Sequence, residues 1–75
     1  MGERGTPRLT SDQVIAVLSH HGFLRIGASG SHQKWRHSLT GKQVIVAHHR
    51  GRVLPLGTMR AIIEGSGIAP SEWLR

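Results

Sequence analysis

The residues with the clearest capacity for chemistry stand in one short stretch, from Gly30 to Arg36. It presents His32 and continues with polar or basic residues around one large aromatic residue, Trp35. If the stretch forms a β-strand, its side chains alternate between two faces, and His32, Lys34 and Arg36 share one of them. A histidine exchanges protons near neutral pH, and neighbouring cations bind phosphate. The pattern therefore predicts acid–base chemistry on a phosphate-containing substrate.

The residues around this histidine suggest specific roles in such chemistry. A neutral imidazole could take the proton from a ribose 2′-hydroxyl, and an imidazolium could protonate a departing 5′-oxygen. Lys34 and Arg36 would stabilise charge on the phosphate, and Gly30 and Ser31 would let backbone and a hydroxyl approach the substrate closely. Taken alone, His32 would more often be a surface histidine without a catalytic role. The sequence offers His49 as the best second acid–base group but does not place it.

The distribution of charge favours a polyanionic partner. The formal net charge is +6 and the sequence pI is about 11.8. No acidic residue occurs from Gln13 to Ile63, a range that holds seven of the basic residues. A purely cationic middle attracts polyanions, of which nucleic acid is the commonest. The open alternatives are a solubilising surface or a surface matched to an acidic protein.

Composition excludes several kinds of site. The chain has no cysteine, which removes disulfides and Cys-based metal centres. The middle of the chain has no carboxylates for a glycosidase pair or for a magnesium or calcium cage. Catalysis would thus be His-based without a metal or cofactor. A zinc site built from His32 and His49 is the disfavoured alternative.

The other histidines have simpler interpretations. His20 and His21 fall at the end of a predicted helix, where they suit the helix dipole. His37 shares the face of Trp35 and is expected to be structural or to lie at a strand end. His48 and His49 are adjacent, so in an extended chain they point to opposite faces and cannot easily bind one metal together.

The elements that must position these residues follow from local signals. Thr10 and Gln13 form a capping box that begins a helix at about 11–21, with Gly22 just after its end. Three strands are predicted at 23–27, 32–37 and 43–47, the first two separated by a turn at 28–31. A second helix follows 55–58, with Gly65 and Gly67 ending it, and a last turn begins near Pro70.

This order is αβββα, an α+β fold with a three-stranded antiparallel sheet. Each helix has one apolar stripe to bury, so both should cover one face of the sheet and leave the face of His32 open. Residues 1–8 read as a flexible tail and 9–75 as a single domain. The N-terminus lacks the apolar segment of a signal peptide, and no apolar run approaches a membrane span, so a cytoplasmic location is expected.

At this level of detail the chain resembles the HicA (YcfA-like) toxins of bacterial and archaeal toxin–antitoxin pairs. The resemblance covers about residues 9–74 and rests on five stretches in order. These are the opening helix into Gly22-Phe23; Gly30-Ser31-His32 with Trp35; the strand ending near His49-Arg50-Gly51; Leu56 to Arg60 with Ile62-Ile63 and Gly67-Ile68; and Ser71-Glu72-Trp73. The chain departs from the usual family pattern at two positions. Ala47 stands where the family usually has a proline, and Met59 stands where it usually has a leucine.

The resemblance implies a fold like that of double-stranded-RNA-binding domains and metal-independent cleavage of mRNA. It places the family histidine on His32 and implies a HicB-type antitoxin that covers the site. The predicted RNA-binding residues are Gly30, Ser31, Lys34, Arg36, His49 and Arg50.

Two other functions fit the same residues. A non-catalytic RNA-binding module would use the basic face to hold phosphates without cutting. A protein-interaction domain would present that face to an acidic partner and show no salt-sensitive RNA binding.

Overall fold

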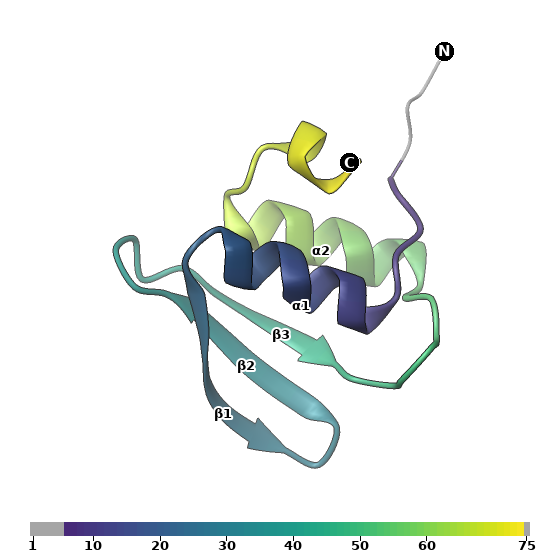
Figure 1. Cartoon of the computed structure of the whole chain (residues 1–75), viewed down its shortest axis with the longest axis horizontal. Helices are drawn as coiled ribbons and strands as arrows, with labels where there is room; N and C mark the ends of the chain where they lie inside the picture. The colour runs from purple at the N-terminus through teal and green to yellow at the C-terminus, as the bar shows by residue number, and fades with distance from the viewer. Residues whose placement is uncertain (1–5, 75) are drawn as a thin grey trace.

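The computed structural model describes residues 6–74 and confirms the predicted α+β order (Figure 1). Two helices lie over one face of a three-stranded antiparallel sheet, and a short 3₁₀ helix follows. The predicted tail at 1–8 falls largely outside the described residues, as does residue 75. The elements are α1 (Ser11–His20), β1 (Phe23–Ser29), β2 (His32–His37), β3 (Gln43–Ala47), α2 (Leu56–Ser66) and η1 (Pro70–Trp73).

Helix α1 begins at the predicted capping box. The Gln13 N–H donates to the Thr10 hydroxyl over 3.2 Å, and the Thr10 N–H donates to the Gln13 side-chain oxygen over 2.9 Å. These bonds satisfy donors that the first helical turn leaves unpaired. The helix ends at His20, one residue before the prediction, because His21 leaves helical dihedrals. Gly22 follows with a φ of 90°, which a glycine adopts without steric cost.

Strand β2 lies at the centre of the sheet and pairs antiparallel with both neighbours. Strand β1 is two residues longer than predicted, because Ala28 and Ser29 continue the pairing. The prediction of a turn at 28–31 is therefore wrong at its first two residues. Only Gly30 and Ser31 connect β1 to β2. Gly30 has a φ of 59° at the first loop position, the dihedral that a two-residue type II′ hairpin requires there.

The core lies between the sheet and the two helices. Trp35, Val44 and Val46 project from the sheet, and Val14, Leu18, Met59 and Ile62 from the helices, all with less than a tenth of their surface exposed. Trp73 in η1 folds back onto this core and is 1% exposed. Among residues 6–74, neither helix has the length and apolar character needed to cross a membrane.

Helix α2 continues through Gly65, which was expected to end it. Gly65 instead gives the helix a close approach to the sheet, since an added Cβ would stand 3.2 Å from a methyl carbon of Val44. Gly67 ends the helix in the left-handed region with a φ of 73°.

The ring of His37 stabilises the turn between β2 and β3. Its Nδ1 accepts the backbone N–H groups of Leu39 and Thr40, each over 3.1 Å. The same ring packs edge-on against Phe23, with ring centroids 5.1 Å apart. This supports the structural role expected for His37.

Replacing His37 with alanine should therefore destabilise the protein by about 1–3 kcal/mol, because two backbone donors and a ring contact lose their partner. Urea denaturation measures the change. The exposed His20 provides the control, and His20→Ala should stay within about 0.5 kcal/mol of the wild type. Equal losses in the two variants would contradict the role given to His37.

Candidate functional site

His32 is the first residue of β2 and is exposed on the sheet face that the helices do not cover. Lys34 and Arg36 are exposed as well, whereas Trp35 between them is buried at 8% exposure. This confirms the alternation predicted for the strand. Because Trp35 faces the core, its alternating neighbours must face solvent.

Residues from all three strands surround His32 and Lys34 in a shallow hollow. Ile26, Gly27, Ala28 and Ser29 of β1 line one side, and Ile45 of β3 lines the other. The pairing brings them together, since His32 lies opposite Ser29 and Ala47 while Lys34 lies opposite Gly27 and Ile45. An imidazole and an ammonium thus stand together on a partly apolar floor.

The two exposed isoleucines of this hollow were not singled out from the sequence. Ile26 is 52% exposed and Ile45 is 47% exposed. Ile26 falls at an irregularity in the β1–β2 register, between Arg25 and Gly27, and such bulges redirect a side chain. For Ile45 a signal was present: it alternates with Val44 and Val46, both of which the core buries.

The two cations of β2 differ in their distance from His32. At about 3.4 Å per residue, Lys34 lies roughly 7 Å along the strand from His32, and Arg36 roughly 14 Å. A guanidinium nitrogen of Arg36 also lies 3.4 Å from where a Cβ on Gly41 would stand, in the turn at the other end of β2. Lys34 can therefore share a phosphate group with His32, whereas Arg36 would reach a different phosphate.

Gly30 and Ser31 form the turn before His32. Gly30 is required by its positive φ, and an added Cβ would meet nothing within 4 Å, so the backbone here is open to a ligand. The Ser31 carbonyl accepts the His48 N–H over 2.7 Å, which joins this turn to the chain after β3.

His48 and His49 have different environments. The His48 ring donates from Nε2 to an Asp12 carboxylate oxygen over 2.7 Å, so its side chain lies toward the start of α1. His49 is exposed, and both of its backbone polar groups bond to the hydroxyl of Ser11. Arg50 is exposed in the following turn, where the Arg52 N–H donates to the His49 carbonyl over 3.0 Å.

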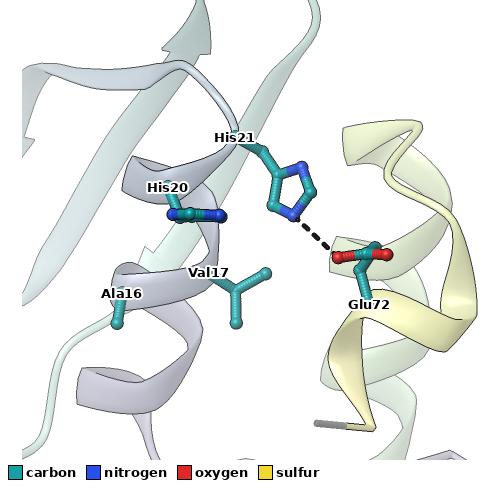
Figure 2. Close-up of a pocket in the computed structure, with 5 residues that line it drawn as sticks. All are labelled: Ala16, Val17, His20, His21 and Glu72. Carbon is teal, nitrogen blue, oxygen red and sulfur yellow. Dashed lines mark ion pairs between the residues drawn. The ribbon is translucent and has the colours of Figure 1, made fainter.

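A second hollow lies on the helical side of the molecule, between α1 and η1 (Figure 2). There Nε2 of His21 pairs with a carboxylate oxygen of Glu72 at 3.5 Å. The His20 ring contacts the His21 ring edge-on, with ring centroids 5.3 Å apart. The pair connects η1 to α1. Across residues 6–74, the structure shows no group of three or more histidine, aspartate or glutamate side chains arranged to hold a metal ion.

The fold and the site define a small α+β protein whose open sheet face carries a histidine beside cations. Comparison with protein families gives a match to the family described as the HicA toxin of bacterial toxin–antitoxin, over residues 11–68. The matched range covers most of the 75 residues and contains His32, all three strands and both helices. This chain belongs to the HicA toxin family. A toxin of this kind implies an antitoxin partner. No curated protein matches the chain by sequence.

Proposed function

We propose that this protein is a metal-independent endoribonuclease that cleaves mRNA, with His32 as a general acid or base. The observation that carries the proposal is the placement of His32. It is exposed on the uncovered sheet face, in a hollow that also holds Lys34. The membership of this chain in the HicA toxin family supports an activity that damages a component of the cell. An RNA substrate of this kind also supports a cytoplasmic location.

The chemistry follows from an imidazole beside a phosphodiester. One acid–base group removes the proton of the ribose 2′-hydroxyl, and the 2′-oxygen attacks the phosphorus atom. The bond to the 5′-oxygen breaks, and that oxygen receives a proton from an acid. The products are a 2′,3′-cyclic phosphate and a free 5′-hydroxyl. An all-DNA analogue lacks the 2′-hydroxyl and should remain intact, so its cleavage would rule out this route.

The cations of this face bind different phosphates of the RNA backbone. Lys34 stabilises the phosphate at the reacting bond, because it is the cation nearest to His32 on the same face. Arg36 and Arg50 bind phosphates on either side, and Gly30, Ser31 and His49 line the approach to His32. Charge-assisted bonds from these donors would set the position of the strand.

Cleavage by the purified protein in EDTA should be abolished or strongly reduced in His32→Ala. Loss of acid–base help is expected to lower the rate by about 10²–10⁴-fold. A fluorogenic RNA measures the rate, and denaturation shows that the variant folds. His20→Ala is the matched control, because that exposed histidine lies on the helical side. Equal cleavage by wild type and His32→Ala would show that His32 is not the catalyst.

The second function is a non-catalytic RNA-binding module that uses the same cationic face. It predicts unchanged binding by His32→Ala and cleavage by neither form. The aromatic residues favour phosphate and shape recognition over base stacking, since Phe23, Trp35 and Trp73 are all buried.

RNA binding should depend on salt through the cations of the open face. Replacing Lys34 with glutamine should reduce the slope of log affinity against log salt concentration by roughly one unit. Arg60→Gln supplies the control, because Arg60 is exposed on α2 in the helical layer. Fluorescence anisotropy at several salt concentrations gives both slopes. An unchanged slope for Lys34→Gln would contradict the binding face.

We also propose that a HicB-type antitoxin covers the same face. The face combines cations with the exposed apolar residues Leu24, Ile26 and Ile45. Such a mixture suits an acidic protein surface with apolar residues at its centre. Covering His32 would block access of RNA.

Ile45→Asp should weaken the complex with the HicB-type protein by about tenfold or more, because a charge would be buried against an apolar partner. Leu39→Asp is the control, because it also replaces an exposed aliphatic side chain with a carboxylate. Leu39 lies in the β2–β3 turn and is 89% exposed, so this variant should bind as the wild type does. Titration calorimetry measures both affinities. Equal affinity of both variants would place the antitoxin elsewhere.

A further inference from the structure

Two hydrogen bonds to one serine side chain attach the chain just after β3 to the first turn of α1. Ser11 is completely buried, and its hydroxyl accepts the N–H of His49 over 3.1 Å. The same hydroxyl donates to the carbonyl of His49 over 3.3 Å. One buried side chain thus satisfies both backbone groups of an exposed histidine. The backbone of His49 is fixed while its imidazole remains available.

The register of the sheet brings the chain just before this histidine next to His32. Ala47 lies opposite His32 on the neighbouring strand, and His49 comes two residues later. The His48 N–H donates to the Ser31 carbonyl over 2.7 Å, which continues the pairing one residue past β3. Within paired strands, residues in this diagonal relation have Cα atoms about 7–8 Å apart and can contact one another through long side chains. The His48 ring bonds Asp12 at the start of α1, so if the alternation of β3 continues to His49, the ring of His49 faces the side of His32.

We infer that Ser11 is a positioning residue that holds the imidazole of His49 across from His32, so that the two histidines act on one phosphodiester. This inference rests on the proposed ribonuclease function and supplies its missing acid–base partner. One imidazole takes the 2′-hydroxyl proton as the 2′-oxygen bonds to phosphorus. The other gives its proton to the 5′-oxygen as the P–O5′ bond breaks.

A two-histidine mechanism has a kinetic signature that a structural role for Ser11 does not produce. The rate depends on one neutral and one protonated imidazole, so kcat/KM plotted against pH should be bell-shaped. Displacing His49 weakens the proton transfer that its imidazole makes in the reaction. One limb of the bell should therefore flatten when Ser11 or His49 is changed.

The test compares two matched pairs of variants by the pH dependence of RNA cleavage in EDTA. Ser11→Ala is paired with Ser66→Ala, because Ser66 is also buried and makes two hydrogen bonds, to Ile63 and Ile68, outside the site. His49→Ala is paired with His20→Ala, an exposed histidine on the helical side. His49→Ala keeps the backbone bonds to Ser11 and so does not depend on how well Ser11→Ala folds.

We expect kcat to fall by about 10–100-fold in Ser11→Ala, with one limb flattened, because small displacements of a catalytic group are costly. His49→Ala should lose about 10²–10⁴-fold and show the same flattened limb. Ser66→Ala and His20→Ala should keep both limbs. An intact bell in His49→Ala, or equal effects within either pair, would overturn the inference while cleavage by the wild type still supports the ribonuclease. Absence of cleavage by the wild type would reject the proposed function itself.

Discussion

The burial of Trp35 is the constraint on which the site depends. Strand β2 is the central strand, so both of its edges are paired and its rotation about its own axis is fixed. With the indole against the helices, alternation leaves the imidazole of His32 and the ammonium of Lys34 in solvent. A slip of one residue would exchange the two faces and bury the cations. The free energy gained by burying Trp35 therefore determines that the side chains of His32 and Lys34 face solvent.

The first turn of α1 has a second function besides starting a helix. The capping box of Thr10 and Gln13 satisfies two N–H groups at the start of the helix, while Ser11 bonds to His49 and Asp12 bonds to His48. Nearby, the Leu54 N–H donates to the carbonyl of Leu9, so the segment before α1 also contacts the far end of this loop. The loop that carries Arg50 is thus held at both ends. A basic loop that is fixed in this way loses less conformational entropy when it binds a polyanion.

The histidines show why residue type alone does not assign a role. His37 accepts two turn N–H groups, His21 pairs with Glu72 across two helical elements, and His48 bonds the start of α1. Each of these rings has a partner that gives it a structural explanation. His32 and His49 are both exposed, His32 where β2 begins and His49 just after β3 ends at the same edge of the sheet. Their availability, rather than their number, makes this end of the sheet the candidate site.

The sequence by itself determined the order of elements, the capping box of α1, the bounds of β2 and β3, and the two faces of β2. These features depend on local hydrogen bonding and on side-chain periodicity, which neighbouring residues already contain. Only the tertiary structure decided that Ala28 and Ser29 extend β1, that Gly65 lies within α2, and that Ile26 joins the hollow around His32. Only it separated Arg36 from that hollow and connected Ser11 to His49, residues far apart in the chain. Strand pairing and packing between distant segments fix these relations, and no local pattern encodes them.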